Sequence, residues 1–323
     1  MNESLNEIPN ETPNKTSNNT SEALRNPFVE GSVGVTDEEL AAQARSGDRD
    51  ALELLFIRHL LWIFNLSVRM LRVHADAEDA TQEILIKVMK ALPGFRGESK
   101  FRTWLYRIAV NHILNVKKGK WAVSDAICSL PLAADGLRRV PDLDLPDPRT
   151  VPVPVELLIE ETKNHCTIGT LLCLDGRQRL VFILGEVFGV SDEVGAEIAE
   201  VTPVNFRQIL SRARRDLYEY LRGNCSLVNA ESHCKCAKKT RAFVQAGFVD
   251  PQKMEFTKAH LHKVREVAGE RADELQAAYM KVGAAVYRDH PFYEPAEQAA
   301  MLQRVVKSLS LSLSLSLSLQ TPS

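Results

Sequence analysis

The chain has 323 residues, of which 45% are hydrophobic and 25% are charged, and its net charge is −2 at pH 7. These values predict a soluble globular protein of two or three domains. They exclude binding of nucleic acid through overall charge, so any such surface has to be a local basic patch. No signal peptide and no run of 18 apolar residues is apparent, so we expect a cytoplasmic protein that does not span a membrane.

The first third of the chain predicts a polar tail followed by a helical domain. Residues 1–35 are polar and lack periodicity, which is typical of disorder. Thr36 and Glu39 form a capping-box pattern, and apolar residues then recur at helical spacing up to residue 119. We therefore expect a helical domain over residues 36–119.

The rest of the chain predicts a second helical domain and a C-terminal extension. Residues 120–155 contain six prolines and form a linker, because that density of proline cannot build a packed element. Residues 156–222 are helical again, and residues 223–307 hold a Cys/His segment followed by two or three more helices. Residues 308–323 are a low-complexity Ser-Leu tail. The expected fold class is all-α, with two small helical domains joined by a Pro-rich linker, plus a helical C-terminal extension.

An acidic helix is predicted to begin near Asp76. Asp76, Asp79 and Glu83 lie three to four residues apart and share one helical face, with Gln82 on the adjacent face. Such a face can meet a basic partner and is poorly suited to contact DNA. The alternative is an ordinary solvated helix.

The next stretch, residues 96–120, has the opposite character. Seven Lys and Arg residues stand against one acid, and aromatic residues interleave with them. Cations bind phosphates, and exposed aromatic faces can stack on unpaired bases, so this mixture suits single-stranded DNA better than duplex. The alternative is that Phe101, Trp104 and Ile108 are core residues, with at most one ring edge of Trp104 exposed.

Residues 189–215 predict a helix-turn-helix. Ser191 can cap the first helix, and Thr202 can cap the second, which has Pro203 at its first position. Polar and basic side chains at the start of such a second helix read base edges in the major groove. The side chains expected to face DNA are Thr202, Asn205, Arg207, Gln208, Ser211, Arg212, Arg214 and Arg215.

A cluster of soft metal ligands follows the second helical domain. Cys225, His233, Cys234 and Cys236 lie within twelve residues, and thiolates with an imidazole are competent to bind zinc. Their spacing is not that of a paired C-x2-C motif, so a connector without metal is the alternative. Zinc is thus a candidate ligand, and no cofactor is required by the rest of the sequence.

Together, DAEDATQEILIKVMKALPGFRGESKFRTWLYRIAVNHI and GVSDEVGAEIAEVTPVNFRQILSRARRDL resemble an extracytoplasmic-function sigma factor of the sigma-70 superfamily. The resemblance covers about residues 36–222. It implies that the first segment is sigma region 2 and the second is sigma region 4, which reads the minus-thirty-five element. It implies polymerase contacts by Asp76, Asp79, Gln82 and Glu83. It implies contacts to the melted minus-ten element by Arg96, Lys100, Phe101, Thr103, Trp104, Arg107, Asn111, Lys117 and Lys118.

The predicted helix-turn-helix departs from the family pattern in its first helix and in its turn. Glu200 stands where the turn usually carries glycine, and Gly195 stands where an apolar residue usually anchors the first helix. Arg207 and Gln208 also differ from the common Gly-Thr-Val start of the recognition helix. We expect the fold to tolerate these changes and the promoter sequence that is read to differ.

The function that this resemblance implies is promoter recognition and initiation of transcription with bacterial core RNA polymerase, and not enzymatic catalysis. The expected partners are core polymerase and promoter DNA, with an anti-sigma factor or the C-terminal extension itself as regulator. A free-standing helix-turn-helix regulator is the alternative, but it needs neither the acidic helix nor the basic aromatic helix. A redox or metal enzyme ranks last, because no general base is placed beside the cysteines at a recognisable spacing.

Overall fold

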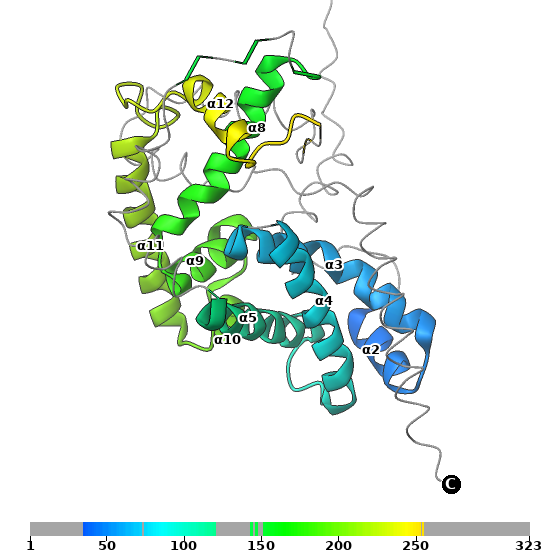
Figure 1. Ribbon diagram of the computed structural model, residues 1–323. Helices are drawn as coiled ribbons and strands as arrows, with labels where there is room; N and C mark the ends of the chain where they lie inside the picture. Colours follow the sequence, from blue (N-terminus) through cyan, green and yellow to red (C-terminus); the bar gives the residue numbers. More distant parts are fainter. Residues whose placement is uncertain are drawn as a thin grey trace, which may run out of the picture.

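The computed structural model describes residues 35–72, 74–120, 143–144, 146–147, 151–252 and 254, without the side chains of residues 74 and 116–120. Every regular element within these residues is a helix, which confirms the all-α prediction (Figure 1). The N-terminal tail, most of the linker, the helices expected after residue 254 and the Ser-Leu tail lie outside the described residues.

The N-terminal half contains four α-helices and one short 3-10 helix. They are α2 (Asp37–Arg45), α3 (Arg49–Leu71), α4 (His74–Ala91), η1 (Leu92–Gly94) and α5 (Phe101–Lys120). The predicted capping box is present, because the Thr36 hydroxyl accepts from the Glu39 amide and the Glu39 carboxylate accepts from the Thr36 amide. Asp48 caps α3 by accepting from two backbone amides. Local capping chemistry therefore fixes where both helices begin.

Helix α3 is the central helix of this half. It is long and apolar enough by composition to cross a bilayer, but 67% of its apolar stretch is buried by the rest of the protein. Its buried side chains include Leu55, Phe56, Leu60, Ile63 and Leu66. Its apolar character is therefore explained by its place in the core.

The second half begins one residue earlier than expected and is divided more finely. Its elements are α8 (Val155–Thr170), η2 (Leu171–Cys173), α9 (Gly176–Phe182), the π-helical turn η3 (Ile183–Val187), α10 (Asp192–Ala199), α11 (Pro203–Asn224) and α12 (Cys236–Gln245). Helix α12 begins inside the Cys/His segment, which carried no expected helix. It packs on α8 through a small core of Leu158, Phe243 and Val249.

The two halves share one hydrophobic core. The Trp62 ring of α3 meets the Phe188 ring edge-on, with centroids 5.1 Å apart. The buried Arg179 guanidinium of α9 donates to the carbonyl oxygens of Met70, Leu171 and Leu174, each at 3.0 Å. Helices α5 and α10 also lie side by side (Figure 1). The described halves thus form one closed body.

Candidate functional site

The predicted acidic face lies on α4 and is open to solvent. Asp79 and Glu83 are exposed, while Asp76 and Gln82 are half-buried. The opposite face of α4 is fully buried in the core through Ile84, Leu85 and Val88. Burial of one face leaves the carboxylates of the other face available to a basic partner.

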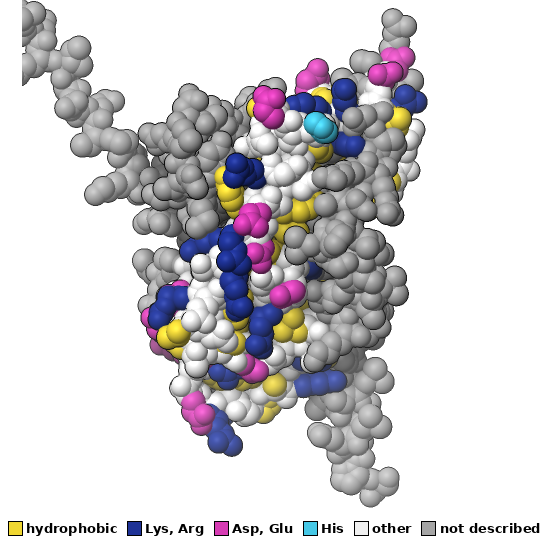
Figure 2. Space-filling view, turned by 90° about the vertical axis from the view of Figure 1, so that its left-hand side faces the viewer, with side chains coloured by type: hydrophobic (Ala, Val, Ile, Leu, Met, Phe, Trp, Pro, Cys, Tyr) yellow, Lys and Arg dark blue, Asp and Glu magenta, His cyan; other side chains and the backbone are white. Residues whose placement is uncertain are grey.

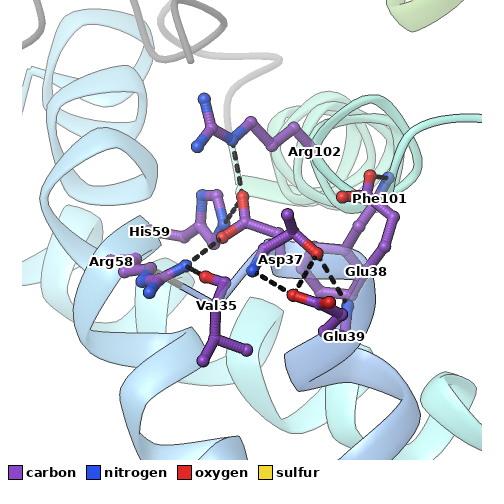
Figure 3. Close-up of polar contacts among 9 residues, drawn as sticks. Val35, Asp37, Glu38, Glu39, Arg58, His59, Phe101 and Arg102 are labelled. Atoms are coloured by element: carbon purple, nitrogen blue, oxygen red, sulfur yellow. Dashed lines mark hydrogen bonds and ion pairs between the residues drawn. The ribbon is translucent and has the colours of Figure 1, made fainter. Parts of the chain in front are cut away.

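The start of α5 is held by a buried carboxylate that the sequence did not single out (Figure 3). The two Asp37 oxygens bind Arg58 Nη1 at 3.0 Å, His59 Nε2 at 3.1 Å and Arg102 Nε at 2.6 Å. Burial alone raises the pKa of Asp37, but the hydrogen bonds and charges of His59 and Arg102 outweigh it and hold this pKa well below its ordinary value. Asp37 therefore stays ionised and ties α2, α3 and α5 together.

A second acid of α2 contacts the first residue of α5. The Glu38 carboxylate accepts a hydrogen bond from the Phe101 backbone amide at 3.0 Å (Figure 3). Helix N-terminal amides have no partner within their own helix, and a carboxylate there also complements the helix dipole. Two neighbouring acids, 63 and 65 residues away along the chain, thus position the basic aromatic helix.

Three aromatic rings form a cluster around the start of α5. Phe95, Phe101 and Trp104 lie with their ring centroids 5.1 to 5.5 Å apart. Trp104 is half-buried, as expected, but Phe101 and Thr103 are buried. Because Phe101 and Thr103 are buried, they do not lie on the surface that could touch DNA. Their predicted DNA contacts are therefore corrected: both side chains pack beneath that surface and support it.

The polar side chains predicted to meet melted DNA differ in how far they are exposed. Arg96 and Lys100 are exposed, and Lys100 directly precedes the first residue of α5. Arg107 is half-buried, and Asn111 is exposed. Both contact acids at the C-terminal end of α10, namely Glu197 and its C-cap residue Glu200. The side chains of Lys117 and Lys118 lie outside the described residues.

A buried histidine joins the acidic helix to the basic one. His112 Nδ1 of α5 lies 2.7 Å from Lys87 Nζ, and His112 Nε2 lies 3.5 Å from the Glu83 carboxylate. Burial, followed by the charge of Lys87, lowers the pKa of His112 despite the opposing charge of Glu83. A neutral imidazole can accept from Lys87 and so bridge the two helices.

The helix pair α10 and α11 has the predicted caps. The Ser191 hydroxyl accepts from Val194 N at 3.4 Å, and the Thr202 hydroxyl accepts from Asn205 N at 3.2 Å. Figure 2 faces the side of α11 and shows Lys and Arg side chains gathered in a band. The exposed polar residues near the start of α11 are Thr202, Arg207, Gln208, Ser211, Arg212 and Arg215, with Asn205 half-buried.

Arg214 differs from the other basic residues of α11. Its guanidinium forms an ion pair with the buried carboxylate of Glu186 in η3. A buried carboxylate needs such a partner, so Arg214 is committed to joining α11 to the preceding turn. We therefore remove Arg214 from the residues expected to face DNA.

The cysteines of the Cys/His segment line a pocket with a fourth cysteine from α8. Cys225, Cys234 and Cys236 meet Cys166 there, whereas His233 is exposed and is not part of the lining. Burial, reinforced by the neighbouring thiols, raises the pKa of Cys166 well above its ordinary value and that of Cys236 to about 12. Within the described residues, no three His, Cys, Asp or Glu side chains are already arranged to hold an ion.

Comparison with known proteins identifies the family. Residues 55–123 match the family described as sigma-70 region 2. The chain is 30% identical to the RNA polymerase sigma-H factor of Pseudomonas aeruginosa over 181 residues, which are 55% of this chain and 90% of that protein. It is 31% identical to the ECF RNA polymerase sigma-E factor of Escherichia coli over 185 residues, which are 56% of this chain and 91% of that protein.

Among solved structures, one titled "Structure of CnrH in complex with the cytosolic domain of CnrY" covers 61% of this chain and 99% of that chain. Its sequence identity is 24% and its TM-score is 0.41.

Together with the all-α fold, these matches place the chain among the RNA polymerase sigma factors. The chain belongs to the extracytoplasmic-function RNA polymerase sigma factors of the sigma-70 superfamily. Its function is promoter-directed initiation of transcription, and the alternative of a free-standing helix-turn-helix regulator is set aside.

Proposed function

We propose that three surfaces of this sigma factor divide the work of initiation. The acidic face of α4 binds core RNA polymerase, α5 captures the melted minus-ten element, and α11 reads the minus-thirty-five element in duplex DNA. Residues 36–119 then correspond to sigma region 2, residues 156–222 to region 4, and residues 120–155 to the connector. The observation that carries this proposal is that an exposed acidic face and a basic aromatic helix lie on adjoining helices of one domain.

The chemistry of each surface supports its assignment. Carboxylates repel DNA phosphates, so the α4 face suits a basic protein partner. Arg96, Lys100, Arg107 and Asn111 can bind the backbone and edges of unpaired nucleotides, and the exposed edge of Trp104 can stack on a base. The polar start of α11 matches the donors and acceptors of the major groove.

No surface in this proposal performs bond chemistry. The factor positions polymerase and DNA in the cytoplasm, and polymerase supplies catalysis, so we assign no enzymatic activity and no membrane association to this chain. Regulation is assigned to an anti-sigma factor or to the extension that begins at residue 223.

Reversing the charge of the acidic face of α4 should weaken polymerase binding. In the Asp79→Lys/Glu83→Lys variant we expect the affinity for core polymerase to fall by at least about tenfold, because like charges then face the basic partner. Fluorescence anisotropy or surface plasmon resonance with core polymerase measures this. The control Glu53→Lys/Glu219→Lys makes the same charge change at exposed sites on α3 and α11. Equal affinity of both variants would remove α4 from the polymerase interface.

We propose, as a second function, that the cysteine pocket takes up zinc. Four thiols, those of Cys166, Cys225, Cys234 and Cys236, line one pocket. Among the described residues no three of them are already placed around one ion, so zinc binding would have to draw them together into a sulfur site. Burial raises the pKa values of Cys166, Cys225 and Cys236, so metal binding has to release protons from these three thiols and weakens as pH falls.

Metal analysis of the full chain tests the zinc proposal. We expect about one zinc per chain, a lower melting temperature after chelation, and loss of both in Cys234→Ser/Cys236→Ser. The His233→Ala variant should keep its zinc, because His233 is outside the pocket. If the full chain contains no zinc and gains no stability from added zinc, the proposal is wrong. The cysteines then serve only to pack α8 against the end of α11 and the segment after it.

A further inference from the structure

Two side chains of α5 contact acids of the predicted helix-turn-helix. Arg107 Nη2 lies 3.3 Å from Glu197 Oε1, and Arg107 Nε lies 4.0 Å from Glu200 Oε1. Asn111 Nδ2 donates to Glu200 Oε1 at 3.3 Å. Both acids sit at the end of α10, which runs beside α5 (Figure 1). Two of the groups proposed to bind melted DNA are therefore engaged by carboxylates of the same chain.

Glu200 has a backbone conformation that favours glycine. Glu200 ends α10 with φ +54° and ψ +49°, in the left-handed region. Glycine adopts this conformation readily, whereas a residue with a Cβ is disfavoured in it. A glutamate thus holds a position at which glycine fits the backbone better, and its carboxylate is what binds α5.

The closed arrangement cannot engage both promoter elements at once. The names of the two elements place them about 25 base pairs apart, which is about 85 Å along B-form DNA. In the closed structure, α5 and α10 touch through contacts of 3.3 Å. The Trp62–Phe188 contact and the hydrogen bond from Arg179 to Met70 also join the two halves. Promoter binding therefore requires the two halves to separate.

We infer that Glu197 and Glu200 form a latch that occupies two DNA-binding groups of α5, Arg107 and Asn111, while the factor is closed. This inference rests on the proposed role of Arg107 and Asn111 in binding melted DNA. The carboxylates and the DNA compete for the same donors, so the latch lowers DNA affinity until the two halves part. Its partner is α5 of the same chain.

Binding of a single-stranded DNA probe by the full chain tests the latch. The probe is a fluorescein-labelled pool of random oligonucleotides of about 20 nucleotides, read by anisotropy. We expect Glu197→Gln/Glu200→Gly to bind it about 5- to 50-fold more tightly than the natural chain, the range expected from losing two exposed ion pairs and one hydrogen bond. The control Glu53→Gln/Glu219→Gln removes the same charge elsewhere and should change affinity by less than about twofold.

A third variant separates the latch from the role of α5. Adding Arg107→Ala to the latch variant should remove most of the gained affinity. If the latch variant binds the probe no more tightly than the charge-matched control, the latch is wrong. That holds even if Arg107→Ala alone weakens probe binding, a result that would support only the role of α5 in binding DNA. If Arg107→Ala weakens binding in neither background, the role of α5 and the latch both fail. The melting temperature of Glu200→Gly should be no lower than that of the natural chain, because glycine suits the left-handed backbone at this position. Such a result would show that the variant keeps the fold.

Discussion

Replacing Asp37 with asparagine should destabilise the protein by about 3 kcal/mol, at the lower end of what removing one member of a buried ion network costs. Three groups, on Arg58, His59 and Arg102, lose their shared carboxylate, while Asp37 itself is only 4% exposed. The lower end applies because Arg58 and Arg102 retain access to water. For a body of this size, a fall in melting temperature of roughly 6 to 12 °C is expected.

The same substitution should change how stability depends on pH. The pKa of Asp37 is lowered in the folded state, so its stabilising contribution is complete above the unfolded pKa of about 3.9 and is lost as pH falls through the folded value. Chemical unfolding between pH 5 and the lowest accessible pH should show a shallower loss of stability in Asp37→Asn than in the natural chain. Glu53→Gln, an exposed neighbour on α3, serves as the control. If the free energy of unfolding depends on pH in the same way for all three proteins, Asp37 is not a buried anion in the folded state.

Replacing Gln208 with alanine should weaken recognition of the minus-thirty-five element by about 1–3 kcal/mol, or roughly 5- to 150-fold in affinity. Gln208 is exposed near the start of α11 and carries no charge, so its loss removes base contacts without changing electrostatic attraction. The expected signature is relaxed preference at one base pair with an unchanged salt dependence.

Arg212→Ala provides the complementary result. If Arg212 contacts a phosphate, its loss weakens binding evenly across sequences and lowers the salt slope by about one. Arg241→Ala, an exposed arginine on α12, controls for net charge. Affinity of the holoenzyme for a pool of minus-thirty-five variants at several salt concentrations measures both. A Gln208→Ala profile identical to that of the natural protein would take this side chain out of base reading.

Local chemistry was predictable from the sequence. The capping box at Thr36, the caps at Ser191 and Thr202, and the proline that begins α11 lie where short-range patterns placed them. Such caps depend on residues two or three positions apart, which a sequence displays directly. Element type followed from apolar spacing for the same reason.

Contacts between distant residues were not predictable from the sequence. No sequence pattern indicates that Asp37 contacts Arg102, or that Cys166 lies near the cysteines after α11, because only the fold brings these residues together. The two departures in the helix-turn-helix also have tertiary causes. A Cβ on Gly195 would lie 2.4 Å from Cζ of Phe206, so the ring fills the space that an apolar residue would take. The carboxylate of Glu200 contacts Arg107 and Asn111 of α5.

Run-off transcription with bacterial core polymerase on a pool of randomised promoters, with and without the full chain, tests directly whether this protein initiates transcription. We expect transcripts from a defined set of promoters only when the protein is present, and more of them with Glu197→Gln/Glu200→Gly. Sequencing the productive templates should reveal two elements, one for α5 and one for α11. If neither the natural chain nor the latch variant directs transcription from any promoter, this chain does not initiate transcription.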